Sequence, residues 1–198
     1  MQRILSLSFI VLFVNAIGGI APAVEARTNL NGTYAFTQVR SCTVANSPFD
    51  DDPSGAPTRI PATGVVARQV AEDSGITTFN ADGTGTTSGR SSSMNISNTT
   101  VGASILSITE FSVPFTYTVN ADNTVDINNG VTTFATVLGG GAGNTGTVDP
   151  RSARLTIGNG ANTLVRAPRT EIEQETLHFN NQTTQYRLCT RSVTLVKM

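Results

Sequence analysis

The two cysteines constrain the fold of this chain more than any other feature. Cys42 and Cys189 are the only cysteines in the 198 residues, and they lie near opposite ends of the sequence. In an oxidising compartment just one intramolecular pairing is open to them, so we expect a Cys42–Cys189 disulfide. Such a bond would join the first and last strands of a closed β architecture, and closing so long a loop stabilises a fold by at most roughly 5 kcal/mol.

The first 26 residues are typical of an export signal. Arg3 precedes an almost continuously apolar stretch, residues 4–17, which is too short to cross a membrane as a helix. Small residues follow, and Val24 and Ala26 occupy the positions that a signal peptidase reads. We therefore expect cleavage after Ala26, a secreted or periplasmic location and a mature domain of residues 27–198. The alternative is a membrane anchor that is retained.

Composition excludes several classes of partner. Charged residues make up 14 % of the chain and the formal net charge is −1, which gives no electrostatic footprint for nucleic acid. We expect no integral membrane span once the signal is removed, and the absence of tryptophan disfavours an outer-membrane barrel. About 170 mature residues suit one domain with one core.

Alternating apolar and polar residues predict strands throughout the mature chain, and no segment carries a helical stripe. The clearest strands are residues 32–44, 108–120 and 183–196. The others that we expect are residues 64–72, 75–80, 84–97, 124–127, 131–138, 154–157 and 171–179. Turns are predicted at 80–83, 120–123 and 128–130, a lid-like loop at 45–63, and a flexible tract at 139–146. The order predicts an all-β, antiparallel meander barrel of about eight or nine strands.

Setting the cysteines opposite each other fixes a register for the first and last strands. In that register Phe36 faces Leu195 and Gln38 faces Val193. The large apolar side chains then share one face without further adjustment, which favours closure of the barrel.

The same register places Arg40 opposite Arg191 on the inner face, where two guanidinium groups require anions. One interpretation is that carboxylates from neighbouring strands, or water, supply the partners. The other is that the two arginines bind the anionic head group of a ligand, with Tyr34, Phe36 and Phe115 as apolar wall. These five are our candidate ligand-binding residues.

Catalytic and metal-binding patterns are weak. The single histidine, His178, has no nucleophile or orienting acid at a recognisable spacing, and we expect a structural strand histidine. The aspartates at 50–52 could offer calcium ligands together with Asp73, but they indicate a solvated acidic loop more than a calcium site, and residues 80–84 indicate a hairpin turn. We expect no catalytic residue, metal or cofactor; a barrel isomerase that relies on cavity shape is the enzymatic alternative.

Gly32-Thr33-Tyr34, at the start of the first strand, together with Arg187 or Arg191 in the last strand, resembles the lipocalin and wider calycin pattern. In that pattern a tryptophan stands where this chain has Tyr34, and an arginine from the end of the barrel packs across it. The stretches NGTYAF, TFNADGTG and YRLCTRSVTLV are also similar to those of small exported bacterial proteins of unknown function. The resemblance implies a calycin-like barrel.

We therefore expect an exported, non-catalytic β-barrel that binds a small apolar or anionic amphipathic molecule. The alternative is a structural or surface-interaction protein, pilin-like or adhesive, with a packed core. An interior cavity of about 300 Å³ or more would separate the two.

Overall fold

The computed structural model describes residues 30–51, 57–59, 65–97, 104–166 and 172–198, and these form an antiparallel 11-stranded sheet with a small separate ribbon. Its strands are β1 (Gly32–Ala45), β4 (Val65–Phe79), β5 (Thr84–Ser97), β6 (Ser104–Val119), β7 (Thr124–Asn129), β8 (Thr132–Gly139), β9 (Thr145–Val148), β10 (Arg151–Gly158), β11 (Thr163–Arg166), β12 (Glu173–Phe179) and β13 (Thr184–Lys197). The ribbon pairs β2 (Asp50–Asp51) with β3 (Pro57–Arg59).

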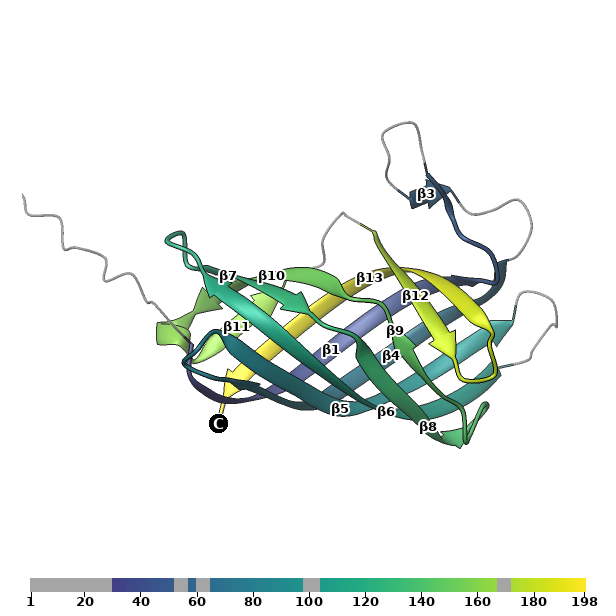
Figure 1. Cartoon of the computed structure of the whole chain (residues 1–198), viewed down its shortest axis with the longest axis horizontal. Helices are drawn as coiled ribbons and strands as arrows, with labels where there is room; N and C mark the ends of the chain where they lie inside the picture. Colours follow the sequence, from purple (N-terminus) through teal and green to yellow (C-terminus); the bar gives the residue numbers. More distant parts are fainter. Residues whose placement is uncertain (1–29, 52–56, 60–64, 98–103, 167–171) are drawn as a thin grey trace, which may run out of the picture.

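The sheet closes on itself as a barrel with a ring of 8 strands (Figure 1). β7 and β8 pair end to end along β6, β10 and β9 continue alongside them, and β11 and β12 lie end to end along β13. Each of these three short pairs therefore fills one position in the ring, and β1 pairs with β13 to complete it. The predicted all-β antiparallel meander is confirmed.

The register of β1 and β13 is the one that the cysteines predict. Cys42 pairs with Cys189 across the two strands, and their sulfurs form the expected disulfide. Arg40 lies opposite Arg191 in the same ladder, as Phe36 lies opposite Leu195. The bond joins the first and last long strands on the inner face of the barrel.

The sequence-based break after residue 72 is wrong, because β4 runs unbroken from Val65 to Phe79. Gly75 lies opposite Gly89 of β5, and a Cβ added at Gly75 would come within 2.9 Å of Phe36 Cε1. This glycine therefore provides space for an aromatic ring and does not form a turn.

The turn predicted at residues 128–130 is also wrong, since β8 continues in the direction of β7. Pro114 of β6 has no N–H to donate, but its carbonyl accepts a hydrogen bond of 2.8 Å from Gly130 N. The sheet is therefore interrupted in the strand beside Pro114, between β7 and β8.

Several short strands escaped the sequence analysis. β9 begins inside the tract that we expected to be flexible, β11 was not predicted, and β2 and β3 belong to the predicted loop 45–63. The predicted strands ending at residues 44, 120 and 179 agree with β1, β6 and β12 to within two residues at that end.

The two Asn-Ala-Asp turns have the same chemistry. Asp82 Oδ1 accepts hydrogen bonds from Thr84 N (3.0 Å) and Thr84 Oγ1 (2.7 Å), and Asp122 does the same with Thr124. These bonds, that from the threonine hydroxyl above all, lower the pKa of both aspartates. Both turns lie at one end of the barrel, between β4 and β5 and between β6 and β7.

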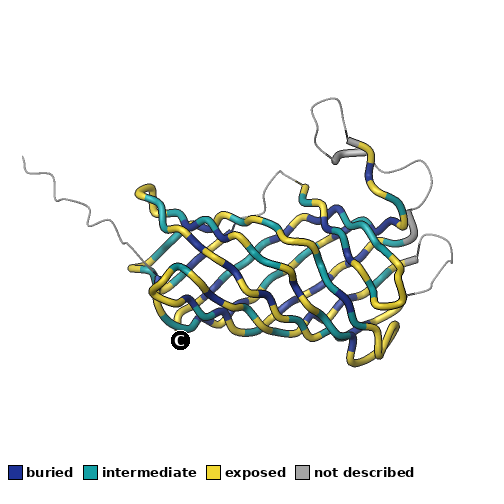
Figure 2. The backbone as a smooth tube through the Cα atoms, in the orientation of Figure 1, coloured by how far each residue is buried: buried dark blue, intermediate teal, exposed yellow. Residues whose placement is uncertain are grey.

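That end is closed by an apolar floor, whose buried members include Leu30, Tyr34, Phe79, Phe115, Tyr117, Val125, Leu164 and Leu195. The rings of Tyr34, Phe115 and Tyr117 each pack against Phe79 at centroid distances of 5.1 to 5.3 Å. Tyr34 Oη donates a hydrogen bond of 2.7 Å to the carbonyl of Ala161. Buried and exposed residues alternate along the strands (Figure 2), as one inward and one outward face require.

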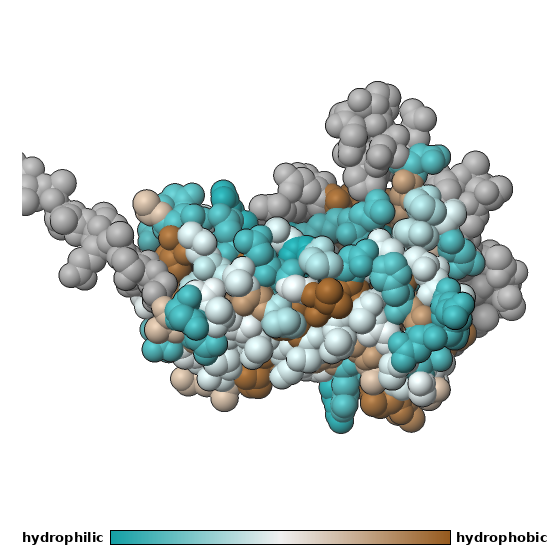
Figure 3. Space-filling view, viewed as in Figure 1, coloured by the Kyte–Doolittle hydropathy of each residue, from teal (hydrophilic) through white to brown (hydrophobic). Residues whose placement is uncertain are grey.

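The outer surface is mixed. On the face shown in Figure 3, apolar side chains form separate patches among polar ones. Among the described residues no helix is long and apolar enough to cross a membrane. The predicted signal peptide, residues 1–26, lies outside the described residues, as does the predicted cleavage point.

Candidate ligand-binding site

The barrel encloses a cavity of about 310 Å³ between the floor and the opposite end, which we call the mouth. The mouth lies beside the β8–β9 turn, residues 140–144, and the β12–β13 turn, residues 180–183. Aromatic and hydroxyl side chains line the cavity from β5, β6 and β8, among them Ser91, Thr109, Phe111, Phe134 and Thr136. β1, β4, β10, β11, β12 and β13 contribute charged side chains, so the cavity has two chemically different walls.

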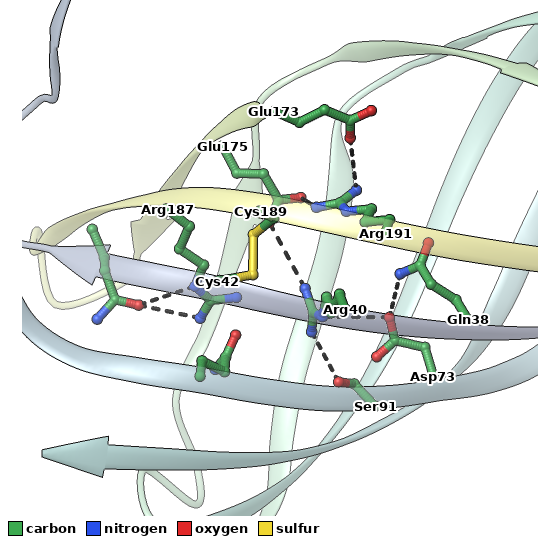
Figure 4. Close-up of a disulfide and its surroundings, with 12 residues drawn as sticks. Gln38, Arg40, Cys42, Asp73, Ser91, Glu173, Glu175, Arg187, Cys189 and Arg191 are labelled. Carbon is green, nitrogen blue, oxygen red and sulfur yellow. Dashed lines mark hydrogen bonds and ion pairs between the residues drawn. A yellow bond between two sulfur atoms is a disulfide. The ribbon is translucent and has the colours of Figure 1, made fainter. Parts of the chain in front are cut away.

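The charged wall is a belt of ion pairs at mid-height, made of Arg40, Asp73, Arg151, Arg166, Glu173, Glu175 and Arg191. Its centre is Glu175, which is buried and which Figure 4 shows beside Arg191. The Glu175 carboxylate forms ion pairs with Arg151 and Arg191 and lies 3.8 Å from Arg40 Nη1. One carboxylate therefore contacts three guanidinium groups.

Asp73 is the second acidic centre, and it is also buried. Its Oδ2 accepts a hydrogen bond of 2.5 Å from Gln38 Nε2 and lies 3.4 Å from Arg40 Nε. Arg40 Nη2 in turn donates to Ser91 Oγ at 2.9 Å. Arg40 is thus held between β4, β5 and β12, and its interactions with protein groups orient it firmly.

Arg166 and Glu173 form a further ion pair, and Glu173 Oε2 lies 3.5 Å from Arg191 Nη1. Arg191 therefore contacts two carboxylates, those of Glu173 and Glu175. This arrangement is the first of the two interpretations drawn from the sequence: neighbouring strands do supply carboxylates to Arg40 and Arg191.

Arg187 is different from the other interior arginines. Its Nε and Nη2 both donate to Gln185 Oε1, at 3.3 and 3.1 Å, and among the described residues no carboxylate is within ion-pair distance. Glu175 lies directly opposite Arg187 in the β12–β13 ladder, but its carboxylate turns toward Arg151 and Arg191. Arg187 lines the cavity on the mouth side of the disulfide.

Burial lowers the pKa of the interior guanidinium groups. Desolvation is the main cause in each case: it lowers the pKa of Arg187 to about 9 and that of Arg191 to about 10. The positive charges of Arg40 and Arg191 lower the pKa of Arg187 further, and Asp73 opposes the shift. Arg40 and Arg151 also have a lowered pKa. Arg187 and Arg191 remain cationic at neutral pH, at a cost in free energy.

Four of the five residues proposed from the sequence line the cavity: Arg40, Arg191, Phe36 and Phe115. Tyr34 does not, because it is fully buried in the floor. The cation over its ring is Lys197, whose Nζ lies 6.0 Å from the ring centroid. The arginines expected to pack across Tyr34 lie elsewhere: Arg191 in the belt and Arg187 on its mouth side.

Arg151, Arg166 and Glu175 were not predicted from the sequence as site residues, and Arg187 was named only for the resemblance to calycins. A usable signal was present, because Arg187 shares the odd-numbered inward face of β13 with Cys189 and Arg191. Glu175 similarly shares the inward face of β12 with Glu173 and Leu177.

Metal ligation finds no support in the described part of the chain. The one group of three potential ligands there is Cys42, Glu175 and Cys189, and its two sulfurs are bonded to each other. His178 is half-exposed on β12, with its Nε2 at 3.0 Å from Asp149 Oδ1. This is a surface contact between β12 and the residue that follows β9.

No family model, curated protein or solved structure matches this chain. The resemblance to lipocalins therefore stays a prediction, and only the geometry of the barrel bears on function.

Proposed function

We propose that this protein is an exported, non-catalytic barrel that binds a small amphipathic molecule in its interior. The observation that carries the proposal is the interior cavity of about 310 Å³, which lies at the lower end of the range typical of small-molecule sites. A barrel of this size can be filled completely by side chains, so the space is a property of this sequence and not of the architecture.

The lining supports an amphipathic ligand rather than a purely apolar one. Phe111, Phe134 and Phe179 offer aromatic surface to the cavity, whereas Arg40, Arg187 and Arg191 present guanidinium groups to the same space. A ligand with an apolar body and a polar head can satisfy both kinds of wall at once. The alternative of a purely structural or adhesive protein requires a filled interior, and the cavity weighs against it.

Export is supported by the Cys42–Cys189 disulfide, since such bonds persist in oxidising compartments. Edman or mass analysis of protein recovered from the source should find the mature N-terminus after Ala26. Retention of Met1 would contradict export by cleavage.

Native mass spectrometry of the protein purified from its source tests the binding function directly, because a retained small molecule would add a defined mass. Binding of octanol, followed by calorimetry, is the complementary measurement. The substitution Ala153→Phe should abolish octanol binding, because residue 153 lines the cavity. Ser152→Phe is the matched control, because Ser152 is exposed on the same strand. A wild-type protein that retains no molecule and binds no octanol would refute the proposal.

A further inference from the structure

We propose that Arg187 binds the oxyanion head group of the ligand, a carboxylate, sulfate or phosphate, while the apolar part lies among the aromatic rings of the opposite wall. This inference rests on the proposed binding function and adds to it the chemical class of the ligand and the residue that selects it. It replaces the pair suggested by the sequence, Arg40 and Arg191, as the main head-group site.

The charge inventory of the interior supports an anionic ligand. With the Arg166–Glu173 pair set aside, four guanidinium groups (Arg40, Arg151, Arg187 and Arg191) face two carboxylates (Asp73 and Glu175) in the described interior. Buried cations that outnumber their anions are costly unless something else supplies negative charge. A bound oxyanion would supply it.

The distribution of contacts singles out Arg187. Arg40, Arg151 and Arg191 each form an ion pair with at least one carboxylate. Within the described part of the chain, the Arg187 guanidinium bonds only to the neutral amide oxygen of Gln185. An incoming anion would therefore meet an unneutralised charge at Arg187 and would have to compete with existing carboxylates at the other three.

The orientation of Arg187 suits this role. Because Nε and Nη2 both bond to Gln185 Oε1, one edge of the planar guanidinium is fixed by the protein. Its Nη1 has no acceptor among the described residues, and the residue lines the cavity. A held guanidinium with free N–H groups loses little conformational freedom on binding an oxyanion, and charge-assisted bonds of this kind are the stronger ones.

Calorimetry on the full chain with two probes of equal chain length, octyl sulfate and octanol, tests the inference. Both are used below micelle-forming concentrations. The wild-type protein should bind octyl sulfate at least about tenfold more tightly than octanol, which corresponds to one charge-assisted hydrogen bond. Arg187→Gln should remove that preference, because it should weaken octyl sulfate binding by more than it weakens octanol binding.

Two further variants keep the test interpretable. Arg90→Gln makes the same change of charge on the outer surface, where Arg90 pairs with Glu110, and should leave the preference intact. Arg187→Lys keeps the charge but loses the planar fork, and should retain a reduced preference. Melting temperatures confirm that each variant is folded.

The outcomes separate the two proposals. If the wild type binds both probes equally, or if Arg187→Gln keeps the preference for octyl sulfate, the assignment of Arg187 is overturned while the binding function stands. If the wild type binds neither probe and retains no molecule from its source, the binding function itself falls and the head-group site falls with it.

Discussion

The floor and the charged belt are built from the same strands by the same alternation of residues, yet their energetics are opposite. In the floor, inward positions carry Phe79, Tyr117 and Val125, which bury apolar surface against one another. A short distance along the barrel, inward positions carry Arg40, Asp73 and Arg191, whose burial costs desolvation. Burial of the floor residues therefore stabilises the fold, whereas burial of the belt residues lowers its stability.

This difference indicates where selection for function would act. A barrel that needed only to fold could fill its middle with leucine and valine, as the floor does, at a gain in stability. Retaining more guanidinium groups than carboxylates there is understandable if an anion completes the set.

Removing the disulfide should have the largest effect. The bond joins residues 147 positions apart, and it lies beside the belt, where apolar packing is scarce. Cys42→Ser/Cys189→Ser should lower the free energy of unfolding by about 3 to 5 kcal/mol, measured by urea denaturation. Hydrogen exchange should show the belt opening before the floor. A loss below about 1 kcal/mol would mean that the belt is stable without its covalent bond.

Truncating the floor should come next. Phe79 is fully buried and touches three other rings, so Phe79→Ala should cost about 3 to 4 kcal/mol of unfolding free energy. Ile76→Ala, at a half-exposed position on the same strand, is the control and should cost about 1 kcal/mol or less. Similar losses for both would show that the floor is not the source of stability that we infer.

The pH dependence of anion binding should reflect the belt. Arg187 in the free protein has a pKa of about 9, so affinity for octyl sulfate should be constant near neutral pH and should begin to fall as the pH approaches 9. Above that pH the guanidinium loses its proton, the probe stays ionised, and affinity should fall by up to about tenfold per pH unit. Octanol affinity should not change over the same range. An unchanged affinity for octyl sulfate at pH values well above 9 would contradict the role of Arg187.

The smallest predicted effect is a gain. Arg187→Met removes an unneutralised, largely buried charge and keeps most of the side-chain volume. We therefore expect the ligand-free protein to become more stable by about 1 kcal/mol, seen as a higher melting temperature. Arg191→Met is the comparison: it leaves the carboxylates of Glu173 and Glu175 with fewer partners, and it should destabilise. Loss of stability in both would mean that Arg187 is a structural residue.

Much of this fold could be predicted from two simple rules. Alternation sets the inward face of each strand, and one cysteine pair fixes the register of β1 against β13, including the approach of Arg40 to Arg191. Glycine was the main source of error. Gly75 and Gly130 look like turns in one dimension, but one makes room for Phe36 and the other bonds to Pro114 across the sheet.

The candidate site was only half visible for a similar reason. That Arg40 and Arg191 are neighbours follows from the β1–β13 pairing, which is a property of two strands. Glu175 contacts Arg40, Arg151 and Arg191 at once. This arrangement depends on how four strands come together around the interior. Arg187 has no carboxylate partner among the described residues for the same reason, because the Glu175 carboxylate pairs with other arginines. The pairing of two strands alone does not predict which arginines it contacts.

Because the ring has an even number of strands, β1 enters and β13 leaves at the same rim. Thr33 O accepts a hydrogen bond of 2.9 Å from Met198 N, so the two described ends of the barrel are in contact beside the floor. A label, a surface tether or a fused domain attached at the carboxyl end would sit on the far side from the mouth. Immobilised in that way, the molecule would stand like a cup on its base, with its opening toward solution.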